Sequence, residues 1–299
     1  MEIENLITEL KSLDLSKYPE GEIRSLLAKM GRIGFISTTL HPGHIIVRAR
    51  PNEEATIFRT REELSYKPGE YNKTFQRAST PHQTMFYGGI VPSGINQNIS
   101  ANARFAPAFE ASHLIRNDTD GIQTLTFTKW EVVKDIPLIT ICHHDDFVGK
   151  HAHTFSLNEE YQRSLKLMPQ DVADRSMKMT AYLAQEFAKK LAPDDEDYNY
   201  MVSSLFTELS LRKTNAGIYY PSVQTLGLGF NVAISPSVVD SSLKLIGASE
   251  CTIYKKGKSI LVDNETSCDI IDDTKPFVLL PMDPKYRFGP EESKKRVGL

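Results

Sequence analysis

The order of strand-like and helix-like windows is the feature that most limits the folds open to this chain. Windows rich in β-branched and aromatic residues occur over residues 44–89, again over 123–142, and once more from 217 onward. Residues 157–212 instead carry apolar residues at helical spacing, and the chain around Gly257 has the pattern of a hairpin. Blocks of strands and helices without regular strand–helix alternation predict an α+β fold rather than a doubly wound parallel sheet.

The same patterns divide the chain into three expected parts. Two short helical patterns predict an N-terminal helical extension over residues 1–40. Residues 41–282 are long enough for one large domain, in a chain of 299 residues that is 40% hydrophobic. The last part, 283–299, is polar and is expected to be a loose C-terminal tail. Within the large domain, the apolar runs 123–128 and 136–142 are expected to be adjacent strands.

Charge and composition exclude several classes of partner. Thirty-five basic and 38 acidic residues give a net charge of −3, so there is no electrostatic case for binding nucleic acid or an anionic membrane. No apolar stretch has the length that a membrane span needs, and the first residues are acidic where a secretory signal is basic. We therefore expect a cytoplasmic protein. Three cysteines without CxxC spacing indicate neither a disulfide framework nor a zinc knuckle.

Polar residues embedded in apolar windows are the candidates for a functional site. Arg48, Tyr87 and Ser222 lie in or at the end of predicted strands, and Glu110 lies among apolar residues in a predicted helix. Arg77 lies in a more polar stretch between them. Charged and hydroxylic groups at the ends of buried strands are how a fold directs chemistry into a cleft.

Taken in order, these windows resemble the RES domain, a family named for its Arg, Glu and Ser. The resemblance spans roughly residues 44–236. It rests on the order of all the motifs along the chain and not on any single motif. Ala49 and Ser79 depart from the family pattern, which often has an aromatic residue after the first Arg and Asn two residues after the second. The windows are Val47-Arg48-Ala49, Arg77-Ala-Ser-Thr-Pro81, Phe86-Tyr87-Gly-Gly89, Ala108-Phe-Glu110, Gly217-Ile-Tyr-Tyr-Pro-Ser222 and Asn231.

The resemblance implies a fold, an activity and a partner. The fold would be that of ADP-ribosyltransferases, with a split, mainly antiparallel sheet and flanking helices. The activity would be cleavage of the glycosidic bond of NAD, by an NAD phosphorylase or an NAD glycohydrolase. NAD is then a substrate and no cofactor is expected, with inorganic phosphate as a candidate co-substrate. A bacterial toxin–antitoxin pair, with a small helix-turn-helix antitoxin as partner, also belongs to this expectation. An ADP-ribosyltransferase acting on a protein target is an alternative, and a homo-oligomer is left open.

The chemistry of NAD assigns a role to each candidate. Arg48 and Arg77 would hold the pyrophosphate through planar, bidentate contacts. Glu110 would stabilise positive charge on the ribose in an oxocarbenium-like state. Tyr87 would stack on nicotinamide or ribose, and Ser222 would hydrogen-bond a phosphate or the nicotinamide amide. The predicted catalytic residues are Arg48, Glu110, Tyr87 and Ser222, and the predicted NAD-binding residues are Arg48, Arg77, Tyr87, Ser222 and Asn231.

Two other classes of protein compete with this interpretation. His143 and His144, followed by His151 and His153, lie near acidic residues and could hold zinc or iron in a metal-dependent enzyme. The segment reads as a loop after a strand, however, and contains no HExxH spacing, so we expect no metal site. The third class is an interaction module that docks a partner on its helix faces, although such faces more often belong to a core.

Overall fold

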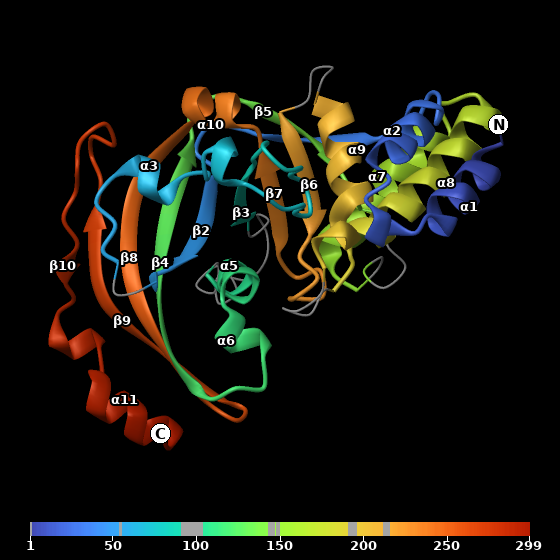
Figure 1. Cartoon of the computed structure of the whole chain (residues 1–299). Helices are drawn as coiled ribbons and strands as arrows, with labels where there is room; N and C mark the ends of the chain where they lie inside the picture. The colour runs from blue at the N-terminus through green and yellow to red at the C-terminus, as the bar shows by residue number, and fades with distance from the viewer. Residues whose placement is uncertain are drawn as a thin grey trace. The chain divides into compact units, whose positions relative to one another are not determined.

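The computed structural model has an α+β architecture with a large, mostly antiparallel mixed sheet and flanking helices (Figure 1). The α+β prediction is therefore confirmed. Contacts within the chain divide it into two compact units: unit 1 contains Met1–Leu40, Lys67–Tyr87 and Ile136–Asp240, and unit 2 contains His41–Tyr66, Gly88–Asp135 and Ser241–Leu299. The structure describes residues 2–53, 56–90, 104–142, 147, 150–190, 196–211 and 216–299.

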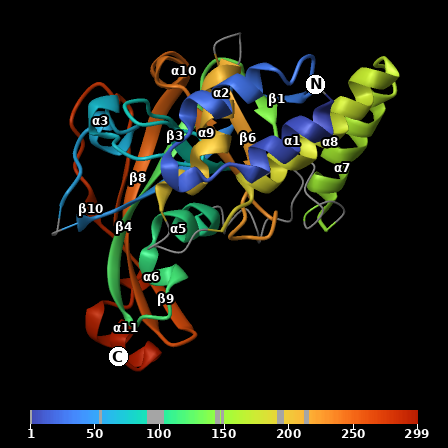
Figure 2. The same cartoon turned by 45° about the vertical axis from the view of Figure 1, so that its right-hand side comes forward.

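Unit 1 contains the helices that the sequence pattern predicts, short ones near the N-terminus and others in the region of residues 157–212. They are α1 (Ile3–Ser12), α2 (Glu20–Ala28), α7 (Ala152–Leu165), α8 (Gln170–Phe187) and α9 (Met201–Leu211). The blue helices α1 and α2 lie beside the yellow helices α8 and α9 in both views (Figures 1 and 2). Their apolar faces share one core, in which Leu6 and Leu27 are buried together with Leu183 and Phe206. The N-terminal helices are thus part of the core of unit 1.

The strands of unit 1 follow the order β1-β5-β6-β7. They are β1 (Ile36–Leu40), β5 (Ile136–Thr140), β6 (Gly217–Pro221) and β7 (Phe230–Ile234). The β5–β6 pair is parallel, and the β1–β5 and β6–β7 pairs are antiparallel. Gly217 is required where β6 and β7 pair, because a Cβ there would lie 2.0 Å from the carbonyl oxygen of Ala233.

The strands of unit 2 are all paired antiparallel. They are β2 (Ile45–Pro51), β4 (Gly121–Val132), β8 (Leu243–Lys256), β9 (Ser259–Asp269) and β10 (Leu280–Pro281), in the order β2-β4-β8-β9-β10. The strand β3 (Phe86–Ile90) pairs with β2 through Gly89 and Val47. The hairpin predicted around Gly257 is the β8–β9 turn, where Gly257 has a φ of 53°.

One predicted strand pairing is wrong. Residues 123–128 belong to β4, which pairs with β2 and β8, whereas residues 136–140 form β5, which pairs with β1 and β6. The two runs follow each other closely in the sequence, but they belong to different units. The alternation of apolar and polar residues within a run predicts that the run forms a strand. It carries no information about which other strand pairs with it.

Short helices complete the two units. Unit 2 contains α3 (Arg61–Leu64), α5 (Phe105–Ala111), α6 (His113–Arg116) and α11 (Pro290–Val297), and α10 (Pro236–Ser242) begins in unit 1 and ends in unit 2. The expectation of a loose tail over residues 283–299 is not met, because α11 packs on β8 and β9.

The carboxylate of Asp263 in β9 ties the C-terminal segment to the sheet. It accepts hydrogen bonds from the backbone N–H groups of Phe288 at 2.9 Å and Gly289 at 2.8 Å, and from the Ser293 hydroxyl at 3.4 Å. Asp263 is 1% exposed. A buried carboxylate with three donors fixes the two residues that lead into the helix and satisfies its own hydrogen-bonding capacity.

Candidate functional site

The six predicted site residues divide between the two units. Arg48 and Glu110 belong to unit 2, and Arg77, Tyr87, Ser222 and Asn231 belong to unit 1. Each set is described within its own unit.

In unit 2, Arg48 lies in the middle of β2 opposite Thr128 of β4. The Thr128 hydroxyl donates to the carbonyl oxygen of Arg48 at 3.3 Å, and the indole N–H of Trp130 donates to the Thr128 hydroxyl at 2.9 Å. The backbone of Arg48 is therefore fixed, and its side chain is half-buried. Arg50, two residues on, donates to the carbonyl oxygen of Glu63 and lies over the Phe58 ring, which gives it a structural role.

Glu110 lies on α5, a short helix that packs against β2. Ala108 of this helix shares a buried cluster with Val47, the residue before Arg48. Pro107, also on α5, approaches β3 so closely that a Cβ on Gly89 would lie 2.8 Å from the proline ring. Glycine at position 89 is therefore what allows α5 to approach β3. The Glu110 side chain is half-buried, and it is held on an element in contact with the strand that carries Arg48.

In unit 1, Arg77 opens a tight turn that Tyr87 holds in place. The turn is closed by paired backbone hydrogen bonds between Gln76 and Ser79, at 2.8 and 3.2 Å. The Tyr87 hydroxyl accepts from the N–H of Ala78 at 3.0 Å and hydrogen-bonds the Ser79 hydroxyl at 2.8 Å. Burial raises the pKa of Tyr87 to about 12, so its hydroxyl stays protonated at neutral pH. In this position Tyr87 fixes the conformation of the turn.

The guanidinium of Arg77 contacts the C-terminal end of α8. It donates to the carbonyl oxygens of Phe187 and of Lys189, the latter at 3.0 Å, and to the Tyr200 hydroxyl at 3.2 Å. It also lies over the Tyr200 ring, 4.9 Å from the centroid. Carbonyl groups at a helix C-terminus carry partial negative charge, which a cation stabilises. Arg77 is therefore a brace between the turn and α8, and its role as a phosphate ligand stays a prediction.

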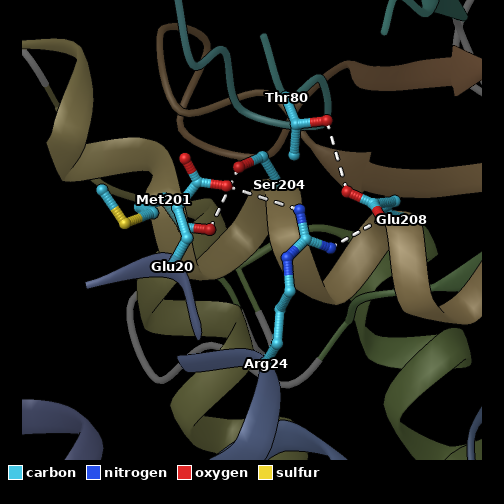
Figure 3. Close-up of polar contacts among 6 residues, drawn as sticks. All are labelled: Glu20, Arg24, Thr80, Met201, Ser204 and Glu208. Atoms are coloured by element: carbon cyan, nitrogen blue, oxygen red, sulfur yellow. Dashed lines mark hydrogen bonds and ion pairs between the residues drawn. The ribbon is translucent and has the colours of Figure 1, made fainter. Parts of the chain in front are cut away.

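The other end of the turn is tied to an ion pair between a nearly buried glutamate and a half-buried arginine (Figure 3). The carboxylate of Glu208 on α9 accepts from the Thr80 hydroxyl at 3.3 Å and from the Arg24 guanidinium of α2 at 2.6 Å. The Glu208 side chain is 8% exposed, and its carboxylate raises the pKa of Arg24. This pair was missed from the sequence because 184 residues separate its members. The local signal that could have pointed to it is Glu208 itself, because a glutamate in an apolar helix needs a basic partner when it is buried.

Ser222 and Asn231 are neighbours on the β6–β7 pair. Ser222, directly after β6, donates its backbone N–H to the carbonyl oxygen of Gly229 at 2.9 Å and is fully buried. Asn231, in β7, is 5% exposed and pairs with Tyr220. Because directly opposed residues of an antiparallel pair share a face, Ser222, Tyr220 and Asn231 lie on one face.

Tyr220 joins this face to the contacts of Arg77. Its ring packs against that of Phe187, with 5.4 Å between the centroids, and Phe187 is the residue whose carbonyl Arg77 contacts. Tyr87 packs against the same core. Through Tyr220, the face that carries Ser222 and Asn231 joins the core that also contains Phe187 and that Tyr87 packs against.

The metal-site alternative gains no support from the described residues. His143 and His144 lie outside them, and no group of three potential metal ligands occurs within them. His151 precedes α7 and hydrogen-bonds the carbonyl oxygen of Leu226 at 3.2 Å. His153, in the first turn of α7, hydrogen-bonds the Tyr219 hydroxyl at 3.0 Å, and burial lowers its pKa. At the start of a helix, side chains two residues apart do not share a face.

Comparison with known proteins adds no further assignment. No protein-family model matches this chain, and no curated protein matches it significantly. Within the part of the chain that the structure describes, no helix combines the length and the apolar character needed to cross a membrane. Function must therefore be inferred from the residues and their geometry.

Proposed function

We propose that this protein degrades NAD by breaking its nicotinamide–ribose bond, as an NAD phosphorylase or NAD glycohydrolase of the RES type. The observation that supports this most directly is that unit 2 carries both charges, Arg48 on β2 and Glu110 on α5. Because α5 packs on the face of β2 that carries Val47 and Ala49, and side chains alternate along a strand, the Arg48 side chain leaves β2 on the other face. A cation for phosphate and an anion for the ribosyl cation are the two charges that the reaction needs. The order of the motifs along the chain provides the second line of support.

In the proposed reaction the C–N bond between ribose and nicotinamide breaks, and its electron pair leaves with neutral nicotinamide. The ribose then carries positive charge, which the Glu110 carboxylate stabilises. An oxygen of phosphate or water attacks the anomeric carbon, and in the case of water a proton is released. Arg48 holds the pyrophosphate in the ground state and in the transition state alike.

The unit 1 residues have distinct roles in this proposal. Ser222 and Asn231, adjacent and buried, supply hydrogen bonds to an amide or a hydroxyl of the substrate. Tyr87 and Arg77 act as positioning residues through the turn over residues 76–79, since their polar atoms contact that turn and the end of α8. A cytoplasmic location and a helix-turn-helix antitoxin partner are further parts of the same proposal.

The decisive experiment is to incubate the purified full-length protein with NAD, with and without inorganic phosphate, and to identify the products. ADP-ribose alone indicates hydrolysis, and a phosphorylated ADP-ribose that forms only with phosphate indicates phosphorolysis. ADP-ribose attached to protein supports the alternative of an ADP-ribosyltransferase. Consumption of NAD by none of these routes overturns the proposal.

Two substitutions separate the roles of the charged pair. Arg48→Ala should raise the apparent KM for NAD by about ten- to a hundredfold, since a charge-assisted hydrogen bond contributes about 1.5–3 kcal/mol. Glu110→Gln should mainly lower kcat, because it removes charge that acts on the ribosyl cation. Glu22→Gln, at an exposed position of α2, is the matched control. All variants must keep the wild-type melting temperature, and a folded Glu110→Gln variant with wild-type kcat would remove Glu110 from the reaction.

A further inference from the structure

Unit 2 contains a large groove that includes none of the six predicted site residues. Its volume is about 780 Å³, and its walls come from β4, β8, β9 and β10, with Val47 of β2, Met282 after β10 and Arg104 at the start of α5. This volume lies within the range of small-molecule sites, about 300–1,000 Å³. We propose that the groove is a second binding site and that it takes a short acidic peptide with free termini.

The strand register explains why the sheet is hollow here. Lys129, Gly247 and Asp269 lie side by side on three neighbouring strands, with the glycine in the middle. In the next row on the same face, Ser249 stands opposite Ser267. Directly opposed residues share a face and every second residue returns to it, so glycine and serine form the floor. Small side chains at these positions leave the space above β8 unfilled.

Two opposite charges face each other across this gap. Lys129 and Asp269 are exposed, and among the described residues neither side chain has a hydrogen-bond or ion-pair partner. Their Cα atoms are separated by two strand spacings, roughly 10 Å. The buried Ser249 adds a hydroxyl between them, one row along. A ligand that carries an ammonium and a carboxylate group pairs with both charges at once.

Arg104 adds a third charge to the groove, and this charge determines which net charge of a ligand is complementary. Arg104 lies over the Phe127 ring at 5.4 Å and donates to the Asn264 side-chain oxygen at 2.9 Å, which leaves its positive charge uncompensated by that contact. The groove is therefore lined by two cations, Arg104 and Lys129, and one carboxylate, Asp269. A zwitterion with one further acidic group complements this set. A nucleotide would place phosphate near the cations but offer no cation to Asp269.

The test uses the full-length protein and the dipeptide L-Ala-L-Glu as probe, with binding measured by titration calorimetry. N-acetylation of the probe should weaken binding about ten- to a hundredfold, because it removes the ammonium that Asp269 accepts from. Amidation of its α-carboxylate should weaken binding by a similar factor through Lys129. Absence of binding at millimolar probe, or equal binding of all three forms, would overturn the proposal.

Variants of the two charged residues assign each contact. Lys129→Gln should weaken binding of L-Ala-L-Glu and abolish the penalty of amidation, whereas Asp269→Asn should abolish the penalty of acetylation. Both positions are exposed, so both variants should fold, which their melting temperatures check. The matched controls are Lys258→Gln and Asp118→Asn, exposed in unit 2 and outside the groove. Binding that is unchanged in Lys129→Gln and Asp269→Asn, or displaced by inorganic phosphate alone, would refute the assignment.

Discussion

At the residue scale, two roles are open to Arg77: it can link the turn to the end of α8, or it can bind a phosphate of the substrate. A measurement of stability distinguishes them, because only the first role contributes to the free energy of unfolding. Arg77→Lys keeps the positive charge but loses the planar fork that reaches two carbonyl groups and Tyr200 together. We expect the free energy of unfolding to fall by about 1.5–3 kcal/mol, the contribution of hydrogen bonds to a charged group. Denaturant titration of the wild type and the variant measures this loss.

The control for Arg77 is Arg32→Lys, at an exposed position in the same unit where no change is expected. If Arg77→Lys unfolds at the wild-type denaturant concentration, the contacts at the end of α8 contribute nothing, and a direct role on substrate becomes the better explanation. A loss of stability with an unchanged KM for NAD would instead confirm the bracing role.

The elements that carry the candidate site residues could be predicted from the sequence, but the contacts of these residues could not. The strand around Arg48, the helix around Glu110 and the strand that ends before Ser222 could all be predicted, because each rests on a local pattern. The contacts of Arg77 with Phe187 and Lys189 could not, since 110 and 112 residues separate the partners. An arginine looks the same in sequence whether it binds a phosphate or a helix end.

At the scale of elements, a single carboxylate connects the start of α11 to β9. Asp263→Ala removes the acceptor for the N–H groups of Phe288 and Gly289. Because these are hydrogen bonds to a charged group, we expect amide exchange in α11 to accelerate about ten- to a hundredfold. Hydrogen exchange followed by mass spectrometry measures this on peptides that cover residues 288–297.

Asp283→Ala is the comparison for Asp263→Ala. Asp283 is partly exposed and accepts from the N–H of Lys285 at 3.0 Å, in a short turn before α11. Exchange in α11 should stay at the wild-type rate in this variant. Equal rates in the wild type and Asp263→Ala would mean that packing on β8 and β9 holds the helix without its cap.

Elements and their pairing differ in how well the sequence predicts them. The hairpin at Gly257 was predictable because turn and strands are contiguous, and helices α8 and α9 were predictable from the spacing of apolar residues. The partners of β4 and β5 were not, because pairing depends on side chains from distant segments. Proline at its start, acidic residues in its first turn and Gly298 after its end are local signals of α11. Its contact with Asp263 was not predictable, because 25 residues separate that carboxylate from the first N–H group that it accepts from.

At the scale of the whole molecule, buried tyrosines contribute to the response of stability to alkaline pH. Burial raises the pKa of Tyr87 and Tyr161 to about 12, and it raises those of Tyr182 and Tyr219 further. An unfolded tyrosine titrates near pH 10, so the unfolded state loses its protons first. These groups therefore contribute full stability below about pH 10 and lose it as pH rises toward 12.

We expect the free energy of unfolding to be insensitive to these groups up to pH 9 and to fall above pH 10, by about 1.4 kcal/mol per pH unit for each group. Denaturant titrations at a series of pH values measure the fall, and tyrosinate absorbance should show these residues ionising as the protein unfolds. Tyrosines that all titrate near pH 10 in the folded protein would contradict the burial described here.

The way the two units share the chain has a consequence for synthesis on the ribosome. The polypeptide passes from one unit to the other after Leu40, Tyr66, Tyr87, Asp135 and Asp240. The helices of the first forty residues share their core with residues of the segment that ends at Asp240, so they leave the exit tunnel long before their partners exist. At roughly 5–20 residues per second, that wait lasts on the order of ten seconds. During that interval the apolar faces of α1 and α2 are open to chaperones, which makes the nascent chain, rather than the finished protein, the form most in need of protection.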